Sequence, residues 1–233
     1  MLEEEKQFMK NGGIKRRIFI FFAILSFFSL SVQSEDPLWY AEQLNSMGLF
    51  EGSNNGYELD SPLNREQSIT MIVRLMGEEK QVKEKSYIQV FDDVPAERWS
   101  FPYVMYCYEN GITKGTGEKE FSPEKQVTAE QYITFILRLL GYDDIFPETA
   151  YEKAVMSGLL SSQVKNDLKS KQEFLRKDMV YVSYRSLKTK TSTGKVLAFV
   201  LAEKGVITNE KAKMFDLYGT AENMDSLLDG IMN

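Results

Sequence analysis

The chain has 233 residues, 43% of them hydrophobic and 12% aromatic, which is enough apolar surface for one or two buried cores. It has no histidine and one cysteine, Cys107, so histidine catalysis, a disulfide framework and a histidine or thiolate metal site are excluded within one chain. We expect no metal and no other cofactor. A hydrolase that works with paired carboxylates stays open, because it needs only Asp and Glu.

The charge of the chain excludes two kinds of partner. The formal net charge is −6, from 28 Lys and Arg against 34 Asp and Glu. Because no broad basic field is available, we expect no nucleic acid and no anionic membrane as partner. An anionic polymer would have to be held by a local site.

Residues 1–34 have the pattern of a secretory signal peptide. Three basic residues at 15–17 precede an apolar run over 18–30, and a small-residue cleavage pattern follows at 32–34. As a helix the apolar run would span about 20 Å, less than the roughly 30 Å of a hydrocarbon core, although an uncleaved signal anchor is the alternative. The start codon is either Met1 or Met9. We expect a secreted chain with a net charge of −8 and no membrane contact after cleavage.

Three later segments share one pattern: an aromatic-containing amphipathic helix, a glycine, a loop and a second helix. The glycines are Gly48, Gly111 and Gly158, each followed by an apolar residue, as is usual after a helix C-terminus. The second helices are predicted to begin 17, 18 and 18 residues later, at Arg65, Ala129 and Arg176. This constant spacing indicates internal repeats.

The repeats and the segments around them give a predicted organisation of the whole chain. It comprises a signal peptide at 1–34, repeat one at 36–77, a charged linker at 78–89, repeat two at 90–141, a degenerate repeat three at 143–190 and a C-terminal helical extension at 192–233. Asn64 and Thr128 each stand three residues before a Gln, which predicts a capping box at two of the second helices. No segment alternates as a strand does, so the predicted fold class is all-α.

Repeat two resembles the S-layer homology motif. The likeness is carried by Phe91-Asp92-Asp93-Val94, Trp99, Tyr103-Val104, Gly111-Ile112, Gly115, Gly117, Phe121-Ser122-Pro123 and Val127-Thr128. With the other two repeats aligned to it, the resemblance covers about 36–190. It implies three motifs in a pseudo-threefold bundle with the second helices at its centre, and the sequence itself predicts short C-terminal helices beyond them. It also implies non-covalent attachment to a pyruvylated secondary polysaccharide on Gram-positive peptidoglycan.

The resemblance further implies that a ligand lies in grooves between motifs, held mainly by an arginine in a Thr-Arg-Ala-Glu signature. That signature maps onto Asn64-Arg65-Glu66-Gln67, Thr128-Ala129-Glu130-Gln131 and Leu175-Arg176-Lys177-Asp178, and none of the three is complete. A cation at the first helical position opposes the macrodipole by about 0.3–1 kcal/mol, so it needs an anion nearby. That anion is either a carboxylated ligand, which free N–H groups would also bind, or an Asp or Glu of the chain.

The candidate ligand-binding residues are Asn64, Arg65, Trp99, Gly115, Gly117, Thr128 and Arg176. We expect the site at Arg65 to be the strongest and the site at Ala129 to be nearly silent. Trp99 either stacks on a sugar ring or anchors the start of its helix. The two glycines let their loop turn, and they either leave N–H groups open to a ligand or serve the turn alone.

Three hypotheses about function follow. The first is a non-catalytic module that binds the cell wall. The second is a degenerate S-layer homology scaffold that has lost its glycan site and contacts other envelope or spore-coat proteins. The third is a wall hydrolase with paired carboxylates, which is the weakest because only about 40 residues remain beyond the repeats. We therefore expect no enzymatic activity.

Overall fold

A computed structural model describes residues 36–215. The predicted signal peptide at 1–34 and the end of the predicted C-terminal extension, 216–233, lie outside the described residues. Residues 37–215 belong to one compact unit. Its helices are α2 (Pro37–Ser46), α3 (Arg65–Met76), α4 (Glu79–Glu84), α5 (Phe101–Glu109), α6 (Ala129–Leu139), the short 3₁₀ helix η1 (Pro147–Thr149), α7 (Ala150–Met156), α8 (Ser162–Ser170), α9 (Arg176–Leu187) and α10 (Leu197–Glu203). A further helical segment covers 209–215.

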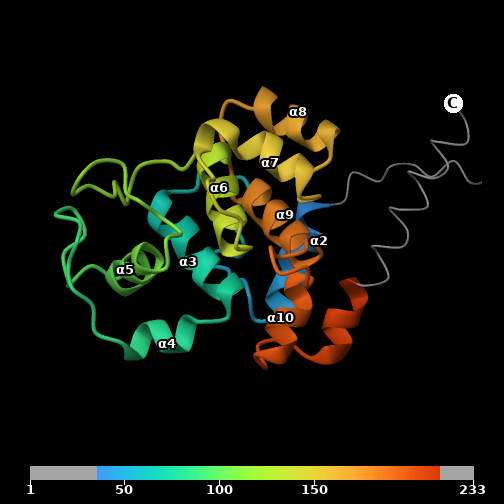
Figure 1. Cartoon of the computed structure of the whole chain (residues 1–233), viewed down its shortest axis with the longest axis horizontal. Coiled ribbons are helices and arrows are strands. Elements are labelled where there is room, and N and C mark those ends of the chain that lie inside the picture. The colour runs from blue at the N-terminus through green and yellow to red at the C-terminus, as the bar shows by residue number, and fades with distance from the viewer. Residues whose placement is uncertain (1–35, 216–233) are drawn as a thin grey trace, which may run out of the picture. The chain divides into compact units, whose positions relative to one another are not determined.

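The prediction of an all-α fold is confirmed. Within residues 36–215 the β-structure is limited to isolated bridges, of which two join loops that precede second helices: Pro62 with Leu175, and Asn64 with Gln126. Helices α3, α6 and α9 lie side by side at the centre, where α6 contacts both of the others (Figure 1). These are the three second helices that the glycine spacing predicted, and each begins at the predicted residue.

The first helix of each repeat packs against the second helix of another repeat. Helix α5 of repeat two packs on α3 of repeat one, α7 of repeat three packs on α6 of repeat two, and α2 of repeat one packs on α9 of repeat three. This exchange buries the apolar face of each first helix on a neighbour instead of within its own repeat. The pseudo-threefold symmetry of the three repeats stays a prediction.

The ends of the central helices follow from local sequence. Asn64 Oδ1 accepts the Gln67 N–H at 2.9 Å, and Thr128 Oγ1 accepts the Gln131 N–H at 3.3 Å, so both predicted capping boxes are confirmed. A side-chain cap of this kind contributes about 1 kcal/mol. At α9 the position is Leu175, which has no side-chain oxygen to cap the helix.

The core runs continuously through the repeats. Tyr132, Ile133 and Ile136 of α6 are fully buried, and the Tyr132 hydroxyl lies 2.6 Å from Ser183 Oγ of α9. Cys107 is fully buried in α5, and this burial raises the pKa of its thiol. The thiol therefore behaves as a small core side chain.

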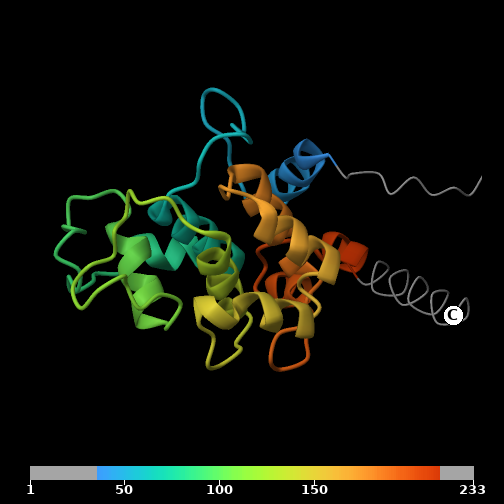
Figure 2. The ribbon, with the colours of Figure 1, turned by 90° about the horizontal axis from the view of Figure 1, so that it is seen from above.

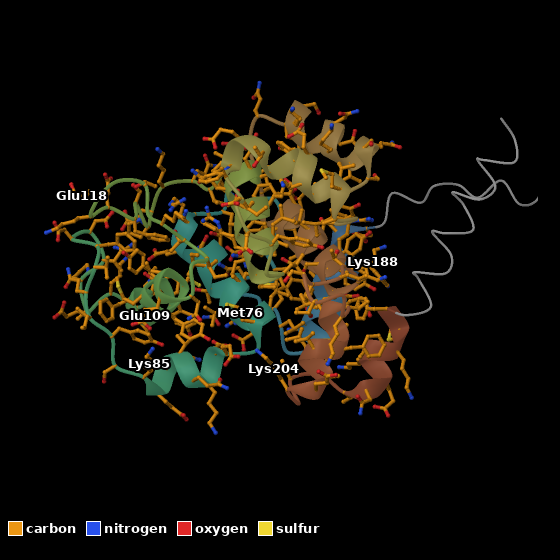
Figure 3. The ribbon with its side chains drawn as sticks, viewed as in Figure 1. Met76, Lys85, Glu109, Glu118, Lys188 and Lys204 are labelled. Atoms are coloured by element: carbon orange, nitrogen blue, oxygen red, sulfur yellow. The ribbon has the colours of Figure 1, made fainter. Side chains whose placement is uncertain are left out.

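Part of the segment predicted as a charged linker, 78–89, is helical. Helix α4 lies within this segment. Of its six residues Val82 alone is fully buried, which is too few to produce a recognisable hydrophobic period in the sequence. Lys85, which follows α4, pairs with Glu109 at the end of α5 at 2.6 Å (Figure 3).

Residues 188–215, here called the C-terminal strap, pack on the same core as the repeats. The strap lies against the C-terminal ends of three helices. Lys204 Nζ donates to Met76 O at 2.8 Å (Figure 3). The Ser192 N–H donates to Leu140 O at 2.8 Å, and Lys211 Nζ donates to Ser46 O. Lysine ammonium groups at helix C-termini satisfy free carbonyls and complement the macrodipole.

Candidate functional site

The loop before α6 is hydrogen-bonded to the first turn of α3. The Arg65 N–H donates to Lys125 O at 3.0 Å, and the Glu66 N–H donates to Pro123 O at 3.1 Å. These two acceptors stand four and six residues before Ala129, where α6 begins. Repeat two is thus joined to repeat one through backbone groups that a free helix N-terminus would leave open.

The loop before α3 is joined to the first turn of α9 in the same register. The Arg176 N–H donates to Ser61 O at 3.1 Å, and the Lys177 N–H donates to Leu59 O at 2.8 Å. Here the acceptors stand four and six residues before Arg65, where α3 begins. This loop projects from the helices around it (Figure 2). At α3 and α9, therefore, the N–H groups that were expected to meet an anion are already paired.

The side chain of Arg65 is buried between repeats one and two and is only 2% exposed. Its Nε donates to Phe121 O at 2.8 Å and its Nη1 to Gln131 Oε1 at 3.1 Å, while the guanidinium lies 4.7 Å from the Phe121 ring centroid and 5.7 Å from that of Phe135. Burial lowers its pKa to about 10, and the charge of Asp93 acts in the opposite direction. Its partners are a backbone carbonyl, a side-chain amide oxygen and two aromatic faces, so it joins the repeats without an ion pair.

Arg176 makes the equivalent contacts but is only half-buried. Its Nε donates to Tyr57 O at 3.0 Å, and its guanidinium lies 5.5 Å from the Phe50 ring centroid. Burial lowers its pKa, whereas the charge of Glu58 raises it. Within residues 36–215, neither terminal guanidinium nitrogen of Arg176 has a hydrogen-bond partner. These nitrogens are available to a ligand.

Arg176 and Trp99 line one cavity of about 120 Å³, here called the Trp99 groove. The indole is 54% exposed, although Trp99 is also close to Tyr103, with ring centroids 6.4 Å apart. Helix α3 forms one wall of the groove with Gln67, Thr70 and Arg74. The structure therefore brings together two of the residues selected from the sequence. The three α3 residues were missed, although their spacing of three and four places them on one helix face.

Charges in the Trp99 groove are unevenly paired. Arg74 is held by Glu51 at 2.7 Å and by Glu79 at 3.2 Å, so its charge is neutralised locally. Arg176 has no such salt bridge within the described part of the chain. The groove therefore offers one guanidinium that is not used in an ion pair.

Glu66, next to Arg65, stands where the signature has alanine, and it is 4% exposed. Arg98 donates to its two carboxylate oxygens at 2.7 and 2.9 Å, and Ser100 Oγ donates at 2.6 Å. Burial would raise the pKa of Glu66, but these bonds, together with one from Trp99, lower it. This carboxylate is fully engaged in holding α5 against α3, so we assign it a structural role.

Gly115 and Gly117 line neither the Trp99 groove nor the cavity at the start of α6. Gly115 has φ +82°, and a Cβ there would lie 2.6 Å from both Glu120 O and the Phe91 ring. The N–H groups of both glycines bond within their own loop, to Thr113 Oγ1 and to Glu120 O. The conformation of the turn is sufficient to explain why glycine occupies these two positions.

Thr128 lines a second cavity, of about 220 Å³, here called the α6 groove. It lies between the first turn of α6 and residues 168–174, and Ala129 and Glu130 also line it. Asn64 lines neither groove, and its side chain is used in capping α3. Of the seven candidates from the sequence, three thus line the two separate cavities and four have structural roles, in a helix cap, in the link between repeats and in a turn.

The described residues contain no cluster of three or more Asp, Glu or Cys side chains that could hold a metal ion. Over the same range, none of the helices has the length and apolar character needed to cross a bilayer. Aromatic, amide, hydroxyl and cationic side chains line the two grooves.

Comparison with known families defines the class of the chain. Residues 90–133 match the S-layer homology domain, so the resemblance that repeat two carried is confirmed. The chain contains an S-layer homology domain, and the matched residues include Trp99 and Thr128.

Similar proteins come from bacterial surfaces. The chain is 31% identical over 118 residues to the middle cell wall protein of Brevibacillus brevis, a match that covers 48% of this chain and 11% of that protein. It is 32% identical over 106 residues to a cell surface protein of Thermoanaerobacter kivui, covering 45% and 14%, and 33% identical over 103 residues to a surface layer protein of Brevibacillus choshinensis, covering 44% and 9%.

A further match, 36% identical over 78 residues, is to an endoglucanase of a Bacillus species and covers 8% of that enzyme. The chain spans between 8 and 14% of the length of these relatives. Together with the S-layer homology domain, the similarities support a cell-surface binding module.

Proposed function

We propose that this chain is a secreted, non-catalytic module that attaches to the cell wall by binding an anionic secondary polysaccharide in the Trp99 groove. The observation that carries the proposal is an exposed indole beside a guanidinium with two unpaired nitrogens, Trp99 and Arg176. A sugar ring packs on an aromatic face, and a carboxylate accepts paired N–H bonds from a guanidinium.

The groove suits a carboxylated sugar, such as one with a pyruvyl ketal. The carboxylate binds to Arg176, the ring lies on Trp99, and the amide of Gln67 and the hydroxyl of Thr70 lie on the α3 wall for the remaining hydroxyls. A local cation is needed because the chain without residues 1–34 has a net charge of −8 and attracts no anion at long range. The likeness to proteins named for the cell wall and cell surface supports the same assignment.

The test is calorimetric titration of residues 35–233 with purified wall polysaccharide, before and after chemical removal of its carboxylated substituents. A charge-assisted hydrogen bond contributes about 1.5–3 kcal/mol, so Arg176→Ala is expected to weaken binding roughly 10- to 100-fold. Trp99→Ala is expected to weaken it as well. The control is Lys177→Ala, because Lys177 is the next residue of α9 and pairs with Asp60 outside the groove.

A second readout uses the two tryptophans of the chain. In a Trp39→Phe variant Trp99 is the remaining fluorophore, and its emission is expected to change on binding. Wild-type affinity in both Arg176→Ala and Trp99→Ala would remove the groove from the mechanism. Equal affinity for the polymer without its carboxylates would remove the anionic ligand.

The scaffold hypothesis is the second candidate, and one observation favours it. Arg65, at the site that was expected to be the strongest, is buried as a link between repeats, so the motif serves folding at that position. A pull-down on peptidoglycan with and without its secondary polymer separates the two functions. Binding that depends on the polymer supports wall attachment, and capture of envelope proteins without it supports the scaffold. Under either function we propose the same repeat boundaries, 36–77, 90–141 and 143–190.

A further inference from the structure

Residues 197–215 have the same layout as the first half of a repeat. In repeats one to three the first helix is followed by a glycine with positive φ, and α10 is followed in the same way by Gly205, with φ +72°. In all four segments the residues four, seven and eight positions before that glycine are buried. They are Tyr40, Ala41 and Leu44 before Gly48; Tyr103, Val104 and Cys107 before Gly111; Ala150, Tyr151 and Ala154 before Gly158; and Leu197, Ala198 and Leu201 before Gly205. Helix α10 therefore has the burial pattern of a first helix.

The likeness continues after the glycine, where the strap matches repeat three. Three residues after the glycine a hydroxyl accepts an N–H group of a short helix and caps it, and ten residues after the glycine an apolar side chain is buried. These residues are Ser161 and Leu168 after Gly158, and Thr208 and Phe215 after Gly205. The capped helices are α8 and the helical segment 209–215. Agreement of the glycine, the cap and the buried positions in one register indicates a fourth copy of the repeat.

The sequence beyond the described residues continues this repeat. In repeats one to three a second helix begins 17 or 18 residues after the glycine, and Ala221 stands 16 residues after Gly205. The stretch Thr220-Ala221-Glu222-Asn223 is similar to Thr128-Ala129-Glu130-Gln131 at the start of α6. Apolar residues then follow at the spacing of one helix face, namely Met224, Leu227, Leu228 and Ile231. The sequence therefore predicts a second helix over 221–231.

The central helices have no place for a fourth first helix. Helices α3, α6 and α9 are already covered by α5, α7 and α2, respectively. Helix α10 packs instead at the C-terminal end of α3, where a Cβ on Gly77 would lie 2.6 Å from Val206 and 3.2 Å from Leu201. The fourth repeat thus lies outside the exchange of helices among the other three. Its second helix needs another surface for its apolar face.

The strap offers such a surface through an apolar side chain and through its charge. Met214 is 42% exposed and stands beside Phe215, whose ring centroid lies 5.3 Å from that of Tyr184 in α9. The strap contains six lysines and two glutamates, whereas residues 216–233 contain four acidic side chains and no basic one. Opposite charges attract, and a short link within one chain gives a high effective concentration. Two acidic segments from separate copies would repel each other, so the strap of the same chain is the favoured partner.

We propose that residues 197–233 form a fourth, shortened repeat, in which a helix over 221–231 docks its apolar face on the strap of the same chain. The docked helix covers Met214 and extends the core beyond the C-terminal end of α3. Its charge is balanced by the lysines of the strap. The described strap residues line neither the Trp99 groove nor the α6 groove, so the proposal does not depend on wall attachment.

The test is hydrogen–deuterium exchange of residues 35–233, read by mass spectrometry of peptides that cover 197–215 and 220–233. We expect the amides of 221–231 to exchange about 10-fold more slowly than those of an unstructured peptide, at every protein concentration. Exchange at the unstructured rate overturns the proposal. Protection that grows with concentration, together with a dimer in sedimentation, also overturns it, because a second copy would then be the occupant.

Two substitutions that add the same charge separate docking from electrostatics. Leu228→Asp puts a carboxylate on the apolar face of the predicted helix, whereas Ser226→Asp puts one on the opposite face. We expect Leu228→Asp to abolish the protection of 221–231 and to speed exchange in 209–215, and Ser226→Asp to change neither. Wild-type protection in Leu228→Asp, or an equal loss in Ser226→Asp, contradicts the docking.

Truncation after Phe215 gives an independent measurement. Removal of 216–233 uncovers Met214, so we expect faster exchange in 209–215 than in the full chain, and unchanged exchange there would contradict the proposal. Polysaccharide binding is expected to be unchanged in Leu228→Asp. Failure of this proposal and failure of the wall-attachment proposal are therefore distinguishable.

Discussion

Replacement of Arg65 by alanine tests whether this arginine is a structural link between repeats. The change removes a charge-assisted bond to Phe121 O, which contributes about 1.5–3 kcal/mol. It also removes the Gln131 bond, about 0.5–1.5 kcal/mol, and contacts with two aromatic faces, about 1–2 kcal/mol. The change also removes the buried Nη2 atom, which has no hydrogen-bond partner, and this stabilises the folded state by about 1–3 kcal/mol. We expect a net loss of about 2–3 kcal/mol in the free energy of unfolding.

The assay is urea unfolding of residues 35–233 followed by far-ultraviolet circular dichroism. With a slope of about 2–3 kcal/mol per molar urea, the midpoint is expected to fall by about 1 M. Lys177→Ala is the matched control, because this residue forms an ion pair with Asp60 at the surface, where solvent screens it, so the midpoint is expected to stay close to that of the wild type. If Arg65→Ala unfolds at the wild-type midpoint but loses polysaccharide binding, the residue is a ligand contact and our structural assignment is wrong.

Three other outcomes are expected. Because the pKa of Glu66 is lowered in the folded state, its contribution to the free energy of unfolding is present above its unfolded pKa of about 4.3 and is lost as the pH falls through the folded value. Urea unfolding at several pH values should show this loss of stability below about pH 4.3. In the Glu66→Gln variant the loss should be smaller. Truncation after Leu187 removes the C-terminal strap and its buried apolar residues, so the fragment is expected to lose its cooperative thermal transition; a stable, cooperative fragment would show that the extension is dispensable. Mass spectrometry of the wall-associated protein is expected to find a mature N-terminus near Glu35, whereas a chain that retains residues 1–34 would contradict cleavage.

Local sequence signals predicted the central helices because their ends are determined by nearby residues. The capping boxes at Asn64 and Thr128 and the left-handed glycine Gly77 depend on contacts within one helical turn. Helices α4 and α8 were not predicted. Each is nine residues or fewer and has one fully or nearly fully buried apolar side chain, Val82 and Leu168, so no period could be recognised.

The order of motifs in repeat two identified the S-layer homology domain, because that identification depends on residue type and spacing alone. The same pattern could not show how each signature residue is used. Arg65 and Arg176 occupy equivalent places in sequence and bond to equivalent carbonyls, yet one is buried and the other lines an open groove. The difference arises from the neighbouring repeat that covers each arginine, and this is a long-range contact.

The sequence by itself determined the helical class, the repeat spacing, the caps and the family, all of which depend on residues close together in the chain. Only the tertiary structure decided which N–H groups and side chains stay open to a ligand. At Ala129, where the site was expected to be nearly silent, the N–H groups of residues 129 and 130 have no backbone acceptor within residues 36–215, because helix α8 replaces the loop that pairs with the first turn at the other two central helices. Whether a polar group is open depends on the segment that packs against it, and here that segment lies about 40 residues away in the chain.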